Sequence, residues 1–423
     1  MGKQIDIDIR RLGPLKDMHI TLRPLTVFTG ESGLGKSYAA LVCYYLFDIL
    51  SGDRIQTYFT QQGIDIRQCW DNPDEEGVVL TIESADLLRW LDEDVVRYVA
   101  YMTGNPDIVG EVHFNLELET KTYVFRRGET VQKDGDVDLR MSQLSCNDSQ
   151  FTSQYGHMLI SDVIFAALLS NSLAKDVIKD DIVAMIRSII LPPSRGALMD
   201  CVSRPKFKAG IYDKFYDFKE RLLSNYYIDF KGDNTVKALI RDVAGGSLEM
   251  KEGEVWFGWD DENRIPLSAA ASSVKELAPY LLWLNSSMMI GTGLLFEEPE
   301  AHLHPSRQKR VADTFSYLMN MRCWMVVTTH SDYLLKRINQ LGRLYSLRLE
   351  HYKEVCDVME RHDLSWESLI DLSEVAAYHL VANGDGTTRA ERIDSPEGIA
   401  FSSFEKVIDS EIDLSADIEI LLG

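Results

Sequence analysis

Residues 25–49, "LTVFTGESGLGKSYAALVCYYLFDI", contain the pattern from which the fold class of this chain follows. It opens with a short apolar run rich in β-formers and closes with a long apolar segment free of glycine and proline, which predicts a buried strand followed by a helix. Between them, Gly30 to Ser37 match the pattern G-x-x-x-x-G-K-[ST] at every fixed position. Strand, glycine-rich loop and helix in that order favour a phosphate-binding loop over a simple glycine-rich turn.

The residue types of this loop suit a nucleoside triphosphate with bound magnesium. Glycines allow backbone conformations in which successive N–H groups point at an anion, and the start of the helix adds partial positive charge. Lys36 is placed to reach the β- and γ-phosphates, and the Ser37 hydroxyl can ligate Mg²⁺. The predicted nucleotide-binding residues of the loop are Gly30, Glu31, Ser32, Gly33, Leu34, Gly35, Lys36 and Ser37.

A second stretch, "LLFEEPEAHLHP" at residues 294–305, crowds carboxylates at the end of an apolar run. Like charges this close repel each other unless a cation or a shared task holds them there. Beside magnesium-bound phosphates, Glu297 is predicted to hold the water shell of the metal, and Glu298 to polarise the attacking water as a general base. Alone, an apolar run ending in Glu would indicate only a strand-to-loop transition.

Two further motifs fit the same chemistry. Ser272 and Ser273 precede the predicted helix "VKELAPYLLWL", where capping hydroxyls and free N–H groups would face an anion. The helix is predicted despite Pro279. In "WMVVTTHSDYLL" a strand from Met325 to Thr328 is followed by His330, which could bond a γ-phosphate. A lone histidine is more often structural, but the order of the motifs favours a functional one.

This order resembles the ABC-type ATPases, in particular the OLD-like ATPases related to the RecF and SMC heads. The stretches that carry the resemblance are "LGPLKDMHITLRPLTVFTGESGLGKS", "LPPSRGALMD", "ASSVKELAPYLL", "LLFEEPEAHLHP" and "VVTTHSDYLL". The resemblance implies an α/β head, in which a mixed sheet flanked by helices carries an N-terminal antiparallel sheet and a helical insertion. It also implies a homodimer, or a larger assembly of such dimers, with each ATP between the P-loop of one copy and the signature helix of the other.

The resemblance assigns a role to each matching position. Ser272 and Ser273 would contact the γ-phosphate held by the opposite copy, and Glu298 would be the catalytic base. Ala301–His304 would form the D-loop, and His330 would be the switch histidine.

The chain also departs from the family pattern. Glu297 stands where many relatives carry Asp, and Val274 where many signatures have Gly, which implies slow hydrolysis with ATP acting more as a clamp. The Q-loop glutamine has only weak candidates in Gln61 and Gln62. Arg195 in "LPPSRGALMD" is either close to the nucleotide or a structural arginine that satisfies carbonyls, and the sequence leaves both open.

Four segments are expected along the chain. They are an N-terminal lobe with the P-loop and an antiparallel sheet (1–150), a helical insertion (151–250), a lobe with the signature, Walker B and switch histidine (251–345), and a C-terminal α+β extension (346–423). Alternating residues in "QIDIDIRRL" and "DMHITLRPL" predict antiparallel strands, and "EVHFNLELET" with "KTYVFRRGET" predicts a hairpin that extends their sheet. Apolar residues at helical spacing predict helices within 158–190 and 210–244.

Composition restricts the partners. The formal net charge of -22 over 423 residues argues against non-specific binding of nucleic acid. Two local basic clusters, 203–208 and 307–310, are either solvated faces or nucleic-acid contacts. The six cysteines form no C-x-x-C pair, and the N-terminus has no apolar signal region, so we expect a cytoplasmic protein without a membrane span.

The function that these observations and the resemblance favour is an ATPase that dimerises on ATP and regulates a separate effector, a toxin or a nuclease, in antiphage defence. The effector would be encoded alongside, and DNA or a phage protein would be the trigger. The main alternative is a DNA-repair ATPase in the manner of RecF and SMC proteins, which binds DNA across the ATP dimer. A transporter motor is disfavoured, because no "LSGGQ"-type signature is present.

Overall fold

The computed structural model describes most of the chain. The described residues are 4–63, 78–134, 137–147, 149–153, 170, 173–178, 185–224, 234–251, 253–260, 262–286, 289–400, 411–416 and 418.

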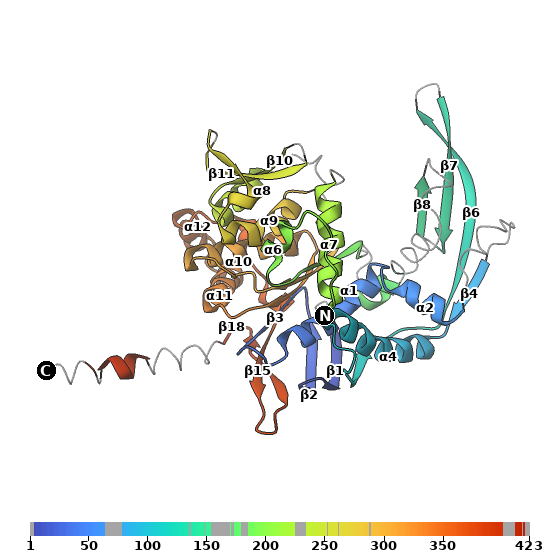
Figure 1. The fold of residues 1–423 in the computed structure, drawn as a ribbon, viewed down its shortest axis with the longest axis horizontal. Helices are drawn as coiled ribbons and strands as arrows, with labels where there is room; N and C mark the ends of the chain where they lie inside the picture. Colours follow the sequence, from blue (N-terminus) through green and yellow to red (C-terminus); the bar gives the residue numbers. More distant parts are fainter. Residues whose placement is uncertain are drawn as a thin grey trace.

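A nine-stranded mixed sheet forms the centre of the molecule (Figure 1). Its strands, in spatial order, are β5 (Gly110–Asn115), β1 (Ile5–Leu12), β2 (Leu15–Leu22), β16 (Thr388–Arg392), β15 (Val375–Ala382), β3 (Leu25–Gly30), β14 (Trp324–Thr328), β13 (Thr292–Glu297) and β9 (Arg187–Leu191). Helices flank this sheet, so the expected α/β class with a mixed sheet is confirmed.

Five neighbouring strands, β15, β3, β14, β13 and β9, run parallel to one another. They are short and almost wholly buried, as expected for parallel strands covered on both faces. Because parallel strands all end at the same edge, the loops that follow them meet there. This edge therefore gathers the loops after Gly30, Leu191, Glu297 and Thr328, which are far apart in sequence.

The other end of the sheet is largely antiparallel. β1 pairs with β2 along nearly its whole length, as predicted, and β5 extends this part by pairing with β1. The predicted hairpin between "EVHFNLELET" and "KTYVFRRGET" is wrong. The strand from Lys121 belongs to a separate four-stranded sheet, because it pairs with the strands on either side of it, Val78–Ile82 and Val137–Cys146, and not with β5.

The helices are distributed around this framework. They are α1 (Lys36–Leu50), α2 (Ile55–Gln61), α4 (Ser84–Thr103), α6 (Arg195–Met199), α7 (Gly210–Leu223), α8 (Asn234–Ala244), α9 (Ser272–Leu284), α10 (Pro305–Asn320), α11 (Asp332–Leu347) and α12 (Tyr352–Arg361), with the 3-10 turns η1 (Leu267–Ala269), η2 (Trp366–Ser368) and η3 (Leu372–Glu374). Helix α1 is buried on nearly all sides, which explains its lack of a polar face.

Helices α7 and α8 confirm the helical pattern predicted within 210–244, although residues 225–233 lie outside the described part. The helical pattern predicted up to residue 190 is wrong at its end, where Arg187–Leu191 form β9 of the central sheet. Most of 158–184 lies outside the described residues.

Three smaller sheets lie outside the centre. The four-stranded sheet of β4 (Val78–Ile82), β6 (Lys121–Asp134), β7 (Val137–Cys146) and β8 (Ser149–Ser153) projects from the body as an arm (Figure 1). The others are β10 (Ser247–Lys251), β11 (Glu254–Gly258) and β12 (Arg264–Pro266), and the pair β17 (Asp394–Ser395) and β18 (Gly398–Ile399). Among the described residues, no helix combines the length and the apolar character needed to cross a membrane.

Candidate nucleotide site

The glycine-rich loop connects β3 to α1 at the edge where the parallel strands end. Gly30 has a φ of 132°, and a Cβ there would lie 2.6 Å from the carbonyl oxygen of Leu380 in β15, so only glycine fits. Gly35, at φ 87°, turns the chain into α1. The loop faces outward, since Glu31 and Ser32 are exposed.

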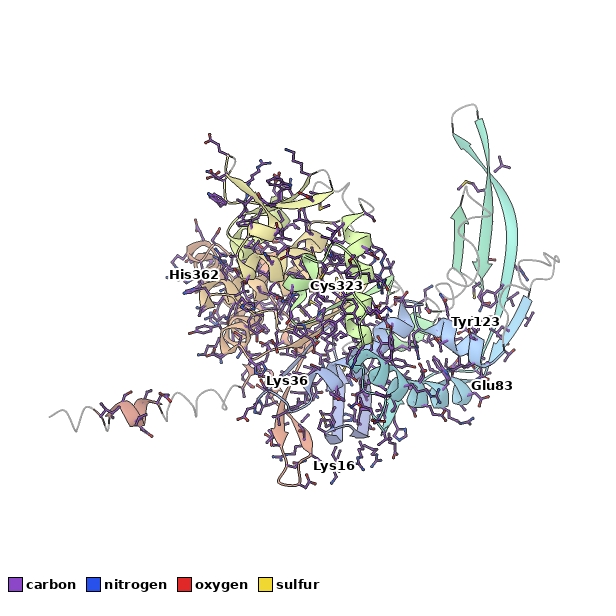
Figure 2. All side chains as sticks on the ribbon, in the orientation of Figure 1. Lys16, Lys36, Glu83, Tyr123, Cys323 and His362 are labelled. Atoms are coloured by element: carbon purple, nitrogen blue, oxygen red, sulfur yellow. The ribbon has the colours of Figure 1, made fainter. Side chains whose placement is uncertain are left out.

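Lys36 lies in the body of the molecule, away from the arm that Tyr123 marks (Figure 2). Its side chain is buried, and its Nζ donates hydrogen bonds to the carbonyl oxygens of Gly30 at 3.0 Å and Glu31 at 2.8 Å. Burial lowers the pKa of Lys36, and the nearby carboxylates of the Glu297 loop partly oppose this shift. The ammonium group is thus held against the loop and faces the acidic cluster, as its predicted role requires.

Glu297 is the last residue of β13, level with Thr328 on β14. Its side chain is only 2% exposed, and burial raises the pKa of its carboxyl group to about 7. The Ser37 hydroxyl donates a hydrogen bond to this carboxyl group, which opposes part of the shift.

The surroundings of Glu297 fit a magnesium ion. Its Oε1 is buried and has no hydrogen-bond partner among the described residues, so a cation beside Ser37 would satisfy an otherwise costly group. The described residues contain no cluster of three or more His, Cys, Asp or Glu side chains able to hold a metal ion. A magnesium ion here would therefore need phosphate oxygens as further ligands, as is usual at phosphate-binding sites.

Glu298 directly follows β13 in a strained conformation. Its φ is 46°, a left-handed value that is unfavourable for a side chain with a Cβ and that often marks functional positions. The backbone N–H of Glu298 donates to the carbonyl of Thr328 at 2.9 Å, and its carbonyl accepts from Ala301 at 3.1 Å. These bonds turn the half-buried side chain out of the line of the strand.

Glu300 makes a contact that the sequence did not reveal. Its Oε1 accepts a hydrogen bond of 2.5 Å from the backbone N–H of His330, which fixes the histidine loop against the carboxylate loop. Burial raises the pKa of the Glu300 carboxyl group. Burial lowers the pKa of the His330 imidazole, and the positive charge of Lys36 lowers it further. His330 is therefore a neutral hydrogen-bonding group at pH 7.

Arg195 proves to be a structural arginine that lies against the site. Its guanidinium is fully buried and donates to the carbonyls of Pro192, Glu276, Glu297 and Glu298, at 3.0, 2.8, 2.8 and 3.3 Å. Burial lowers the pKa of Arg195 to about 10, so it stays charged at neutral pH. Arg195 thereby connects the backbone of helix α9, at Glu276, to the backbone of Glu297 and Glu298. This role becomes visible only once the order of the strands in the sheet is known.

The predicted signature serines lie on a different element from the P-loop. Ser272 and Ser273 are the first two residues of α9, which packs against α6, α7 and α8, whereas α1 packs on the sheet. The expected capping hydroxyl is absent, because the N-cap position belongs to Ala271. Ser272 is exposed and Ser273 half-buried, so the free N–H groups of this helix start face outward.

Two other predicted positions have local partners, and a third is buried. In the predicted D-loop, the His304 ring accepts from Ser306 N–H as the N-cap of α10. Gln61 accepts a hydrogen bond of 2.7 Å from the Trp90 indole, so it contributes to packing between α2 and α4. Val274 is buried.

The arginines of the basic clusters are engaged within the chain. Arg204 pairs with Asp213 and Asp217, Arg307 donates to the carbonyl of Ala244 at 2.8 Å, and the pair of Arg310 with Asp313 spans 3.2 Å. These contacts support the interpretation of both clusters as structural or solvated faces.

Part of the chain is similar to a known family. Residues 169–336, about two fifths of the chain, match the family model described as "AAA domain, putative AbiEii toxin, Type IV TA system". The match spans Glu297, Glu298 and His330 but not the loop from Gly30 to Ser37. No curated protein sequence matches the chain.

Among solved structures, SMC head domains are similar over most of their length. An SMC head bound to the C-winged helix domain of ScpA is 11% identical with a TM-score of 0.38, over 92% of this chain and 96% of that one. The SMC head domain from Thermotoga maritima is 8% identical with a TM-score of 0.33, over 93% and 100%. A Pyrococcus furiosus Smc head with an extended coiled coil, bound to the C-terminal domain of ScpA, is 9% identical with a TM-score of 0.38, over 97% and 99%.

Proposed function

We propose that this chain is an ABC-type ATPase that binds ATP with Mg²⁺ and hydrolyses it slowly. The observation that carries the proposal is the meeting of Lys36, Ser37, Glu297, Glu298 and His330 at one edge of the parallel strands. Each has the chemistry that a triphosphate site needs: a cation, a metal-binding hydroxyl, two carboxylates and a neutral imidazole.

Each side chain has a distinct task in this proposal. Lys36 exchanges its loop carbonyls for phosphate oxygens. Ser37 with ionised Glu297 would hold the metal, which would supply positive charge against the phosphates. Glu298 takes the proton of the attacking water, and the neutral ring of His330 bonds the terminal phosphate. Hydrolysis is slow in this proposal, because the longer side chain of Glu297 stands at the metal-binding position where many relatives carry Asp.

The proposal includes a dimer. Helix α9 begins with the exposed Ser272 and the half-buried Ser273, on a different element from the P-loop. A helix start of this kind is a good anion site, so the phosphate of a facing copy is its natural ligand. Both nucleotides are then shared between two copies.

The biological role rests on the resemblance to OLD-like ATPases and on the family model, whose description names a toxin–antitoxin system. We infer an ATPase that holds and releases a separately encoded toxin or nuclease in antiphage defence, in response to DNA or a phage protein. The DNA-repair alternative gains no support from the basic clusters, whose arginines have partners within the chain.

Two substitutions test the ATPase. Lys36→Ala should abolish binding of ATP, because the buried cation is lost. Glu298→Gln should keep binding but lower turnover by about 10²- to 10⁴-fold, the usual contribution of a general base. Equilibrium binding of a fluorescent ATP analogue and phosphate release measure the two effects.

Glu350→Gln, a matched change of an exposed carboxylate, should leave both measurements unchanged. If turnover survives Glu298→Gln, the assignment of the base is wrong. If wild-type protein binds no ATP with Mg²⁺, the proposed function fails as a whole.

A further inference from the structure

The backbone around His330 is held by side chains on both sides of it. Before it, the hydroxyl of the buried Thr329 accepts a hydrogen bond of 2.9 Å from the Ser331 N–H. After it, the Ser331 hydroxyl caps helix α11 and donates a bond of 2.5 Å to Oε1 of Gln308 on α10. Between them, His330 donates its own N–H to Glu300 at 2.5 Å. This last bond joins the histidine directly to the acidic loop that follows β13.

The loop that carries Glu300 has a fixed backbone. Glu298, two residues before it, has a left-handed φ of 46°, and His302, two residues after it, has a φ of 61°. Such conformations persist only where the surrounding structure determines them. Here the N–H groups of Ala301 and Leu303 donate to the carbonyls of Glu298 and Glu300, at 3.1 and 2.9 Å. Glu300 therefore presents its carboxylate from a fixed turn.

The carboxylate of Glu300 is costly for the stability of the fold. The Thr329 hydroxyl lies beside the group, and Oε1 accepts the bond from His330. Its Oε2, however, is buried and has no hydrogen-bond partner within the described part of the chain. A buried oxygen without a partner lowers stability, and for stability alone an apolar side chain of similar shape would serve better. The residue type therefore indicates a task in the nucleotide site.

We propose that Glu300 is a positioning residue, which holds the His330 ring against the terminal phosphate through its bond to the His330 backbone. The inference rests on the proposed function and deepens it. Because the bond ends on the backbone N–H, it uses neither ring nitrogen of His330. The fixed turn of Glu300 thus sets where the side chain begins, and the ring remains free to bond the phosphate.

Substitution of Glu300 should affect turnover more than binding. A displacement of about 1 Å in a site can cost about 100-fold in rate, so Glu300→Ala should lower kcat by roughly 10- to 100-fold. KM should change little, since the P-loop supplies most of the binding in the proposed function. Glu300→Gln keeps an oxygen that accepts the same bond and should recover most of the loss. Phosphate release at varied ATP concentrations measures kcat and KM for each variant.

A double variant separates positioning from general damage. His330→Ala removes the ring but keeps the backbone N–H that Glu300 binds. If Glu300 acts through the ring, Glu300→Ala should change the turnover of the His330→Ala protein by no more than about twofold. If Glu300 only supports the fold, the two losses multiply, and this result overturns the proposal.

Hydrogen exchange measures the contact itself, without nucleotide. The amide of His330 should exchange faster in Glu300→Ala than in wild type, because its acceptor is lost, whereas Glu300→Gln should keep it protected. Exchange within helix α1, which follows the P-loop, should be the same in all three proteins. Unchanged protection of His330 in Glu300→Ala overturns the proposal.

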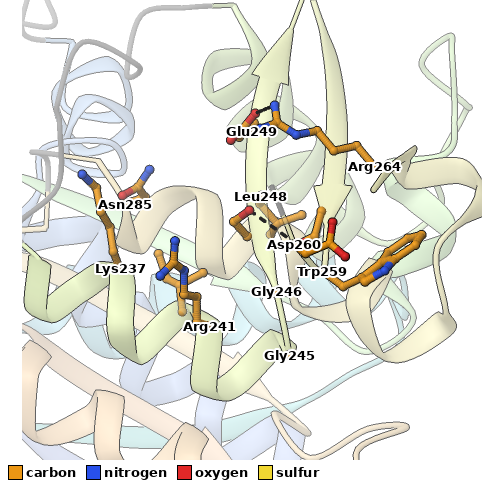
Figure 3. A pocket seen from close by; sticks show the side chains of 13 residues that line it. Lys237, Arg241, Gly245, Gly246, Leu248, Glu249, Trp259, Asp260, Arg264 and Asn285 are labelled. Carbon is orange, nitrogen blue, oxygen red and sulfur yellow. Dashed lines mark hydrogen bonds and ion pairs between the residues drawn. The ribbon is translucent and has the colours of Figure 1, made fainter. Parts of the chain in front are cut away.

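Two carboxylates outside the site provide matched controls. Glu249 on β10 pairs with Arg264 at the surface pocket of Figure 3, whose lining includes none of the proposed site residues. Asp94 on α4 is buried and pairs with Arg54 at 2.8 Å. Glu249→Ala should leave turnover and exchange unchanged. Asp94→Ala should lower the melting temperature without the loss of protection at His330.

Failure of this inference and failure of the proposed function give different results. Wild-type protein that hydrolyses no ATP with Mg²⁺ contradicts the proposed function, and the positioning role fails with it. Wild-type turnover that Glu300→Ala leaves unchanged overturns the positioning role alone. Glu300→Gln that is as slow as Glu300→Ala does the same, because the hydrogen-bond acceptor is then not what the site uses.

Discussion

Glu297 shows how one residue can make the site depend on pH. Burial raises the pKa of its carboxyl group to about 7, and the Ser37 hydrogen bond with the charges of Arg195 and Lys36 only partly offsets this. Below pH 7 the group is neutral and a poor magnesium ligand. In the proposed ATPase, magnesium affinity therefore falls as the pH decreases through 7.

Glu297→Gln should stabilise the metal-free protein at alkaline pH. The folded chain keeps a proton on Glu297 up to about pH 7, whereas the unfolded chain loses it near 4.5, so the wild type loses stability as the pH rises between these values. The glutamine variant has no such loss. Its free energy of unfolding relative to wild type should rise by about 2.5 kcal/mol from pH 5 to pH 8.

Urea unfolding without magnesium or nucleotide measures this difference. Glu350→Gln, which changes an exposed carboxylate, should show no comparable dependence on pH. A relative stability of Glu297→Gln that stays constant between pH 5 and pH 8 would contradict the buried, protonated state of Glu297.

At the scale of elements, Asp48 at the end of α1 joins four parts of the fold. Its buried carboxylate accepts a hydrogen bond of 2.5 Å from Tyr98 on α4 and another from Ser188 on β9, and it pairs with Lys214 on α7. The helix that begins at the P-loop is thereby anchored at its far end. The position of the phosphate loop depends on this anchor as well as on β3.

Asp48→Ala should destabilise the protein by about 3–5 kcal/mol, because it removes the buried carboxylate that Tyr98, Ser188 and Lys214 share. Lys214 then keeps only the longer contact with Asp53, at 3.9 Å. Thermal or urea unfolding measures the loss. Glu93→Ala breaks an exposed ion pair with Arg97 on α4 and should cost less than about 1 kcal/mol. Similar losses in the two variants would show that the Asp48 cluster adds little beyond a surface pair.

The elements also show what the sequence could predict. The P-loop, the strand ending at Glu297 and the strand before His330 are local patterns, and all three form as predicted. The prediction for the strand from Lys121 names the wrong sheet, because alternation of residues identifies a face but not a partner strand. The pattern predicts helix as far as residue 190 where strand β9 forms, since a short apolar run has no decisive period.

Within the site, the residues that belong to sequence motifs could be predicted. The residues whose side chains form hydrogen bonds with backbone groups could not. Arg195 donates to carbonyls at the end of β13, and Glu300 accepts from the N–H of His330 after β14. These contacts exist only because three strands far apart in sequence are neighbours. Nothing in the residues themselves specifies that order.

At the scale of the whole molecule, the proposed shared site requires two copies, and mixing inactive variants tests it. Lys36→Ala and the double variant Ser272→Ala, Ser273→Ala should each lose at least about tenfold in turnover. In a mixed dimer one site carries both defects and the other carries none. Equal mixing with free exchange should therefore restore about one quarter of wild-type turnover, because half of the dimers are mixed and each has one intact site.

Phosphate release and light scattering follow the rescue and the dimer. Mixing two separate preparations of Lys36→Ala is the control and should restore nothing. Failure of the two different variants to complement each other, despite a stable dimer, would place both sets of residues in the same copy's site.

The placement of β15 beside β3 has a consequence during synthesis on the ribosome. Gly30 leaves the exit tunnel 345 positions before Val375, and β14, the other neighbour of β3, also lies far downstream. At about 10 residues per second, the first parallel strand waits roughly half a minute for its partners. A nascent chain with an unpaired apolar strand is a substrate for chaperones, so the nucleotide pocket matures only late in translation.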